Sequence, residues 1–150
     1  MLFRSFAYFS DDNAGNGADN LASLITPTID ASCGGNLQLD FNWGFRSNAI
    51  ATETFTAYIS TNNGAAWTVL QAIPTATTNK GHYTIDITAY SSATMKLRFE
   101  YNDGTGSNWN WAAAIDDVEI RADNASCAPA NDCICKIGRA SCRERVCSTV

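Results

Sequence analysis

Short segments of alternating apolar and polar residues constrain this chain more than any other feature. The clearest runs from Met95 to Tyr101 and reads Met-Lys-Leu-Arg-Phe-Glu-Tyr. The same period of two recurs in four other segments, at 37–45, 55–59, 83–87 and 118–120. Successive side chains of a β-strand point to opposite faces, so each segment predicts a strand with one apolar and one hydrated face.

These segments are bounded by clusters of Gly, Asn, Asp, Ser and Thr, and none of the chain shows a sustained helical period. The pattern is typical of antiparallel sheets packed face to face. We therefore expect an all-β fold, an antiparallel β-sandwich, in one domain over residues 1–121. Residues 122–135 are small and polar and read as a linker or the start of another module.

Composition narrows the class of protein. Of the 150 residues, 45% are hydrophobic and 17% charged, which excludes a disordered polar chain. The formal net charge of −5 argues against nucleic acid as a partner, because phosphates require a basic face. No run approaches the ~20 apolar residues of a membrane-spanning helix, so we expect no membrane insertion.

The tail at residues 136–150 is expected to be artefactual. Ile137 to Val146 resembles the translation of a common sequencing adapter, and such segments are excluded from reasoning about the fold. A genuine basic tail is the alternative. Removing the tail's net +3 leaves −8 on residues 1–135. It also leaves four cysteines, whose oxidation state the spacing does not decide: Cys33, Cys127, Cys133 and Cys135.

A pair of carboxylates near the last predicted strand is a candidate metal site. By alternation, Asp116 shares the core face of Val118 and Ile120, and an inward carboxylate needs a hydrogen bond, an ion pair or a metal. Ca²⁺ prefers six to eight oxygen ligands, and the Asp11-Asp12 loop offers more of them. Asp117 falls on the opposite face. The alternative is that Asp116 caps backbone amides of a neighbouring loop.

Two loops carry further candidates. The segment Ser60–Trp67 has the Ser-Asx-Gly-Trp spacing of an Asp-box hairpin, with Asn63-Gly64 suited to a tight turn, and we expect a structural role. The loop at 102–111 offers Trp109 as an aromatic platform with Asn102 and Asp103 as hydrogen-bonding groups for a sugar. In that loop Trp111 is expected to plug the end of the core.

The sequence gives little support to an enzyme. The only histidine, His82, is expected to be an ordinary surface or edge residue, so a Ser/His/Asp or Cys/His site has one place to form. The adjacent pairs Asp11-Asp12 and Asp116-Asp117 are sent to opposite faces by a strand, unlike the two acids that flank a scissile glycosidic bond. We therefore expect no catalytic activity.

Several motifs in order carry a family resemblance. They occur at 7–12, 24–30, 39–43, 58–67, 97–101 and 114–120, the last reading Ala-Ile-Asp-Asp-Val-Glu-Ile. Together, over roughly residues 5–121, they resemble the MAM-like jelly-roll modules of bacterial secreted and surface proteins, the cleaved-adhesin and choice-of-anchor group. The resemblance implies a lectin-like jelly roll, an extracellular or cell-surface location and often structural Ca²⁺. It transfers the calcium role to Asp116 more readily than to Asp117.

Members of that group usually begin with a further strand bearing an aromatic or acidic segment, which this chain lacks. The N-terminus is accordingly expected to be truncated, with residues 1–9 entering the fold as a strand. The resemblance implies a non-catalytic binding or adhesion module that presents loops to glycan or protein partners beside other domains of the same polypeptide. The alternative is a structural accessory or spacer domain of a secreted peptidase or glycosidase.

Overall fold

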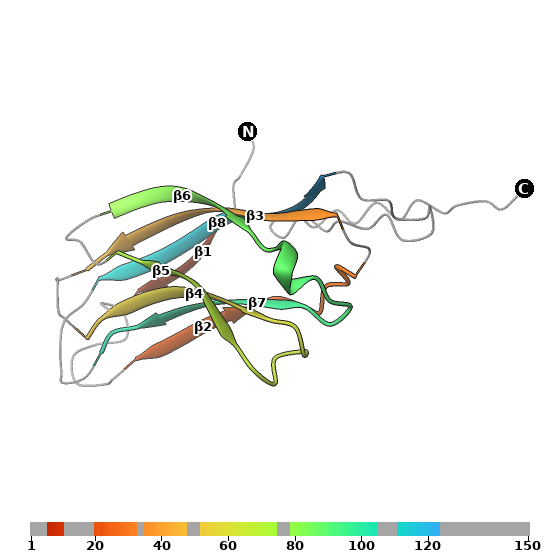
Figure 1. Ribbon diagram of the computed structural model, residues 1–150. Helices are drawn as coiled ribbons and strands as arrows, with labels where there is room; N and C mark the ends of the chain where they lie inside the picture. The colour runs from red at the N-terminus through yellow and green to blue at the C-terminus, as the bar shows by residue number, and fades with distance from the viewer. Residues whose placement is uncertain are drawn as a thin grey trace, which may run out of the picture.

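The computed structural model describes residues 6–10, 20–32, 35–47, 52–74, 79–104 and 111–123. Figure 1 shows their strands arranged in two layers. The elements are β1 (Ala7–Ser10), β2 (Leu21–Ile25), β3 (Asn36–Arg46), β4 (Thr54–Ser60), β5 (Thr68–Ile73), β6 (Asn79–Asp86), the short 3₁₀ turn η1 (Thr88–Tyr90), β7 (Lys96–Asn102) and β8 (Ala112–Asp123).

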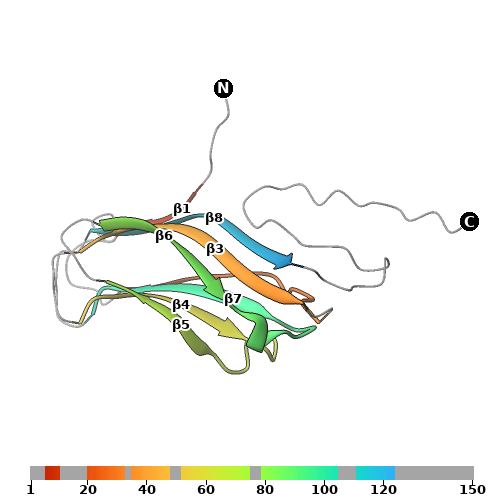
Figure 2. The ribbon, with the colours of Figure 1, turned by 45° about the horizontal axis from the view of Figure 1, so that its top comes forward.

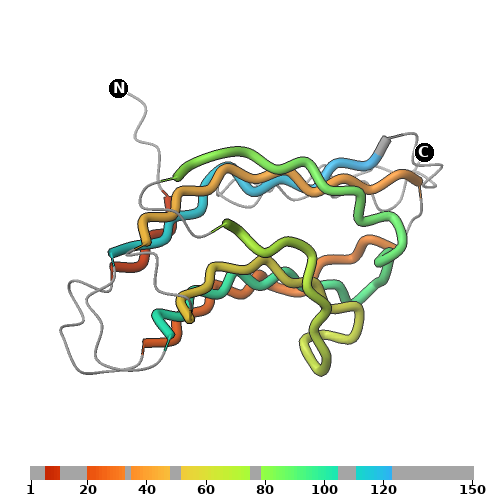
Figure 3. Tube along the Cα trace, turned by 60° about the vertical axis from the view of Figure 1, so that its left-hand side comes forward, coloured from red at the N-terminus to blue at the C-terminus, as the bar shows by residue number. Residues whose placement is uncertain are grey.

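The strands form two four-stranded antiparallel sheets. Sheet I has the order β1-β8-β3-β6 and sheet II the order β2-β7-β4-β5. Figures 2 and 3 show the sheets stacked face to face. Among the described strands only β4 and β5 are consecutive and paired, and every other pairing joins distant parts of the chain. The expected all-β, jelly-roll sandwich is confirmed.

The core lies between the sheets and follows the alternation of the sequence. The odd-numbered residues of β3 from Leu37 to Phe45 are at most 8% exposed. They face Leu97, Phe99 and Tyr101 of β7, and the rings of Phe41 and Phe99 meet edge to face with centroids 5.2 Å apart. Apolar burial on this scale is the main favourable term in folding.

Strand β8 contains a β-bulge that breaks the alternation. Asp40 of β3 pairs with Glu119 and Asn42 with Asp116, so two residues of β8 lie opposite one residue of β3. Asp117 takes up the extra length with a left-handed φ of 49°. As a result Ile115 and Val118 both face the core, each 5% exposed. The predicted inward position of Asp116 is wrong, because the bulge shifts the pattern by one residue and leaves Asp116 on the outer face.

The first and last described strands lie close to the two ends of the expected domain, residues 1–121. β1 begins at Ala7, and β8 continues to Asp123, two residues past the expected end of the domain at 121. The remainder of the expected linker and the adapter-like tail, residues 124–150, lie outside the described residues. In the part of the chain that is described, no helix has the length and apolar character needed to cross a membrane.

Candidate functional site

The outer face of sheet I carries a strip of small residues running across its strands. The register places Ala114 of β8 beside Gly44 of β3, with Tyr8 of β1 on one side and Lys80 of β6 on the other. The adjacent row contains Ser10, Ala112 and Arg46. Glycine or alanine inside a strand leaves room for a ligand or another backbone to approach the sheet closely. We call this strip the sheet I floor: Ser10, Gly44, Ala112 and Ala114.

An aromatic ring and a cation lie at one end of the floor. Trp111 directly precedes β8, and the guanidinium carbon of Arg46 lies 3.4 Å from the centroid of its ring. The Trp111 side chain is 37% exposed. The expectation that Trp111 plugs the core is therefore wrong: its ring packs against the exposed Arg46 at the end of β3.

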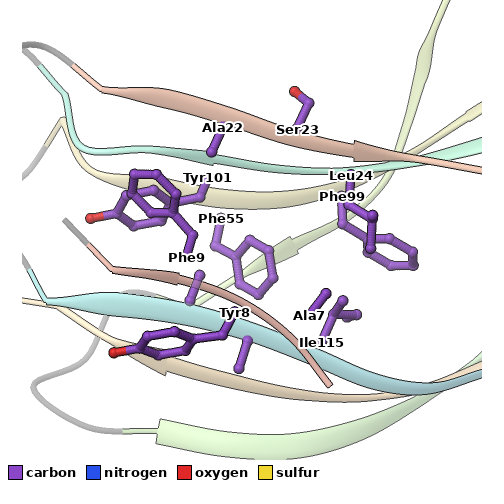
Figure 4. Close-up of a pocket in the computed structure, with 12 residues that line it drawn as sticks. Ala7, Tyr8, Phe9, Ala22, Ser23, Leu24, Phe55, Phe99, Tyr101 and Ile115 are labelled. Carbon is purple, nitrogen blue, oxygen red and sulfur yellow. The ribbon is translucent and has the colours of Figure 1, made fainter. Parts of the chain in front are cut away.

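Two more exposed aromatic rings lie at the β1 side of sheet I, one in β1 and one just before it. Tyr8 and Phe6 are 58% and 59% exposed, and their rings meet edge to face with centroids 6.2 Å apart. Figure 4 shows Tyr8 and Phe9 on opposite sides of β1. Phe9 packs on Tyr101 in the interior, so the alternation of β1 is what presents Tyr8 to solvent.

The opposite end of the floor is polar. Asn42 of β3 lies between His82 of β6 and Asp116 of β8. Its Nδ2 donates to an Asp117 carboxylate oxygen at 3.0 Å, while its Oδ1 lies 2.9 Å from His82 Nδ1. The backbone N–H of Asp117 donates to Asp116 Oδ1 at 2.8 Å, which steadies the bulge. Amide, imidazole and carboxylate groups thus stand beside one another at the edge of a small-residue surface.

Beyond the polar end, Asp40 holds an ion-pair network on the same face. Its Oδ2 accepts two hydrogen bonds from Arg121, at 2.9 Å and 2.6 Å, and its Oδ1 accepts one from Thr84 at 2.7 Å. His82 Nε2 lies 3.2 Å from Oδ1. Burial raises the pKa of Asp40, but the hydrogen bonds from Thr84, Arg121 and His82 and the charge of Arg121 outweigh it, so the pKa lies below its ordinary value.

His82 is exposed on the edge strand β6, as expected. Its ring nitrogens contact Asn42, Asp40 and Thr84. The Thr84 hydroxyl donates to Asp40, so it is not poised as a nucleophile toward the imidazole. These contacts describe a surface polar network that ties β6 to β3.

The expected sugar-binding loop is only partly described. Trp109 lies outside the described residues. Asp103 is 4% exposed, and its two carboxylate oxygens accept hydrogen bonds from the backbone and side chain of Asn20, at 2.7 Å and 3.2 Å. Asn102 Oδ1 accepts from the Gly104 backbone at 2.8 Å. In the structure Asp103 ties this segment to Asn20 at the start of β2, and Asn102 bonds within its own turn. Their binding of a sugar stays a prediction.

Of the four expected calcium ligands, two lie within the described residues and two lie outside them. Asp116 is half-buried and Asp117 exposed on the outer face of sheet I, whereas Asp11 and Asp12 lie outside the described residues. Within the described ranges, no group of three or more His, Cys, Asp or Glu side chains is arranged to hold a metal ion. A calcium site built from Asp116, Asp117, Asp11 and Asp12 stays a prediction.

The hairpin between β4 and β5 has the geometry expected of an Asp-box. The Ser60 hydroxyl oxygen accepts from the Gly64 N–H at 2.9 Å, and Asn62 Oδ1 accepts from the Ala66 N–H at 2.8 Å. Asn63 and Gly64 have left-handed φ values of 59° and 92°. The polar side chains of the motif bind their own turn, which confirms its structural role.

An apolar slot of about 200 Å³ opens between the sheets at the β1 and β2 edge. Figure 4 shows Phe9, Phe55 and Phe99 between the strands there. Its remaining lining is contributed by Ala7, Tyr8, Ala22, Ser23, Leu24, Tyr101, Ala113, Ala114 and Ile115. The described residues that line the slot are apolar or hydroxyl-bearing, so they offer mainly apolar contact.

Sequence reasoning missed Tyr8, Gly44, Arg46 and Lys80 as site residues. The run Ala112-Ala-Ala114 was the available signal, because three consecutive small residues in a strand imply close approach on its outer face. The other members come from strands far apart in the sequence. Only the register of sheet I brings them together.

Several solved structures resemble the fold of this chain. The K1 cleaved adhesin domain of Lys-gingipain from Porphyromonas gingivalis matches 79% of this chain and 74% of its own, with 22% identity and a TM-score of 0.53. The CBM22-1 xylan-binding domain of Paenibacillus barcinonensis Xyn10C matches 79% and 94%, with 8% identity and a TM-score of 0.40. A chain of the infectious bursal disease virus particle matches 77% and 28%, with 12% identity and a TM-score of 0.45.

The adhesin domain shares the jelly-roll sandwich, and the other two likenesses are too distant to carry an argument. No family model matches the chain, and no curated protein matches it either.

Proposed function

We propose that this chain is a non-catalytic binding module of a larger extracellular or cell-surface protein, and that it binds glycans through the outer face of sheet I. The observation that carries the proposal is the sheet I floor, flanked by the exposed rings of Tyr8 and Trp111. Ligand sites combine apolar and aromatic surface with a few placed polar groups. The outer face of sheet I has both the aromatic surface and the polar groups, and it belongs to a two-sheet sandwich.

The chemistry of a sugar ring fits this arrangement. A pyranose has an apolar C–H face that packs on an aromatic ring, and hydroxyls around its edge that need hydrogen-bonding partners. Tyr8 and Trp111 supply the rings, and Asn42, His82 and Asp116 supply polar groups at the far end of the floor. Because the floor side chains are no larger than a serine hydroxymethyl, a ring can lie directly over the strands.

Two further observations support a binding role. The fold shared with a cleaved adhesin domain is in line with an adhesion module. The Thr84 hydroxyl donates to Asp40, so it is not held as a nucleophile for His82 to activate, which is in line with a non-catalytic module. The rival role, a spacer or accessory domain of a secreted hydrolase, requires no ligand at this face.

A glycan array tests the proposal. Wild type is expected to bind a defined set of glycans, and Tyr8→Ala and Trp111→Ala to weaken that binding by about ten-fold each, since each removes a stacking ring. Val69→Ala is the matched control, because Val69 is 55% exposed but lies in sheet II. Thermal melts of each variant verify folding.

Trp109→Ala, run in parallel, separates the sheet face from the predicted sugar site of Asn102, Asp103 and Trp109. Loss of binding in that variant alone places the site on the loop and overturns the sheet I proposal. A folded wild-type protein that binds no glycan on the array also contradicts the proposal and favours the spacer role.

A further inference from the structure

We propose that the glycan bound at sheet I is acidic, and that Arg46 and Lys80 form the subsite for its negative charge. The inference rests on the proposed glycan-binding role of this face and names the class of ligand. Both side chains are exposed, and both stand beside the small-residue floor.

The register places the two cations close together. Lys80 of β6 lies directly opposite Gly44 of β3, and Arg46 follows two residues along β3, on the same face as Gly44. Diagonal neighbours of this kind have Cα atoms roughly 7–8 Å apart, within the reach of long side chains. One acidic group on a ligand lying over Gly44 can therefore contact both cations.

Neither cation is neutralised within the described residues. The ion pairs there join Asp40 to Arg121 and to His82, and Arg98 to Glu100. Arg46 has Trp111 as its neighbour, and Lys80 faces the uncharged Gly44 across the strands. Two cations with no carboxylate partner among the described residues, in a chain of net charge −5, form a local positive site suited to an anion.

Contact with Trp111 orders the Arg46 side chain before it binds an anion. The guanidinium lies over the indole ring, 3.4 Å from its centroid, which restricts the rotation of a long side chain before any ligand arrives. A guanidinium that stacks on an aromatic ring does so with its flat face and keeps its N–H groups at the edge. Those groups match the two oxygens of a carboxylate or a sulfate ester.

The two ends of the face also differ in charge. Asp116 and Asp117 lie at the end nearer Asn42, and Arg46 and Lys80 lie on the other side of that row. An acidic group placed near the carboxylates would be repelled, whereas neutral hydroxyls can donate to them. The face therefore orients a ligand with its acidic group toward Arg46.

The test compares two acidic glycans with a neutral one. Oligogalacturonate, its methyl ester and dextran sulfate are titrated into the whole chain by isothermal calorimetry, with polyglutamate as an acidic polypeptide. We expect oligogalacturonate or dextran sulfate to bind at least ten-fold more tightly than the methyl ester. Tighter binding of oligogalacturonate identifies a carboxylate as the preferred anion, and tighter binding of dextran sulfate identifies a sulfate ester.

Variants of Arg46 and Lys80 test whether these two residues cause the preference for acidic glycans. Arg46→Gln is expected to weaken acidic-glycan binding by about ten-fold and methyl-ester binding by much less. Arg46→Lys keeps the charge but loses the planar stack, and an intermediate loss is expected. Lys80→Gln should act in the same direction as Arg46→Gln. Lys96→Gln, a cation in sheet II, is the matched control and should change nothing.

The outcomes separate the two proposals. Equal affinity for the charged and methyl-esterified chains overturns the acidic subsite while leaving glycan binding in place. Polyglutamate binding as tightly as the acidic glycans also overturns it, because the site then recognises acidic peptide. Failure to bind any of the sugars, here and on the glycan array, contradicts the proposed function itself.

Discussion

Replacing Asp40 by Asn tests how the outer face of sheet I is held together. Asp40 is 7% exposed and accepts hydrogen bonds from Arg121 on β8 and from Thr84 on β6, so one carboxylate ties three strands together. In Asp40→Asn the shape is kept and the charge is lost. The new amide N–H₂ also meets either the Arg121 or the Thr84 donor.

The magnitude follows from the contacts. A hydrogen bond to a charged group contributes roughly 1.5–3 kcal/mol, and removing one partner of a fully buried pair costs roughly 3–5 kcal/mol. The Arg121 side chain is 50% exposed, so water can solvate it once the Asp40 carboxylate is lost, and we expect a value in the first of these ranges. The free energy of unfolding at pH 7 should fall by about 2 kcal/mol, and Tm by roughly 8 °C.

The pH dependence gives a second, independent check. Because the pKa of Asp40 is lowered from 3.8 in the folded state, its contribution is complete above that value and is lost as pH falls through the lowered pKa. The wild-type protein should therefore lose its advantage over Asp40→Asn as pH falls below about 3.8, whereas the variant has no such group to titrate.

Urea unfolding of both proteins between pH 7 and pH 2 measures the difference, with Asp116→Asn as the control. Asp116 is half-buried on the same face, and the Oδ1 of asparagine can still accept from the Asp117 N–H, so little change is expected. Equal stability of wild type and Asp40→Asn at pH 7 would refute the reasoning. A gap that persists unchanged at pH 2 would refute the electrostatic part of it.

Three further predictions concern the frame around the site. Gly81→Ala should cost roughly 1–3 kcal/mol of unfolding free energy in urea, because its Cβ would lie 2.9 Å from the Trp43 ring, whereas at Gly44 the nearest atom lies at 3.8 Å and Gly44→Ala should change little. Ser60→Ala should cost about 1 kcal/mol by removing the acceptor for Gly64 N–H, and an unchanged melt would contradict the hairpin's role. Millimolar Ca²⁺ should raise Tm and a chelator lower it; indifference to both would remove Asp116 from the metal ligands.

The alternation of the sequence predicted the strands that carry no extra bulge residue themselves. In β3 and β7 each apolar residue faces the core, because an unbroken period of two keeps one face turned inward over the whole strand. The Asp-box was also predictable, because its polar side chains bind the turn that they belong to. Both inferences use only neighbours in the sequence.

Bulges explain where the same reasoning failed. In β8 the extra residue at Asp117 moved Asp116 to the outer face. In β5 the register shifts where Ala57 pairs with Gln71 and Tyr58 with Val69, so Leu70 is extra and the strand shows no clean alternation. The position of a bulge depends on the partner strand, and a single strand's pattern does not contain it.

The residues of the candidate site could not be predicted from the sequence, because long-range strand pairing brings them together. Tyr8, Gly44, Lys80 and Ala114 come from four strands, and their adjacency exists only in the register of sheet I. The contact between Trp111 and Arg46 likewise joins residues that are far apart in the chain. Long-range pairing, rather than local composition, assembles this face.

The most direct test of the central claim is an NMR titration of the ¹⁵N-labelled protein with the tightest-binding glycan from the array. The account predicts that amide shifts cluster on the outer face of sheet I, around Tyr8, Gly44, Lys80 and Trp111, and that the Trp111 indole N–H signal moves with them. Shifts confined to the exposed face of sheet II, or to residues near Asn102, would contradict it.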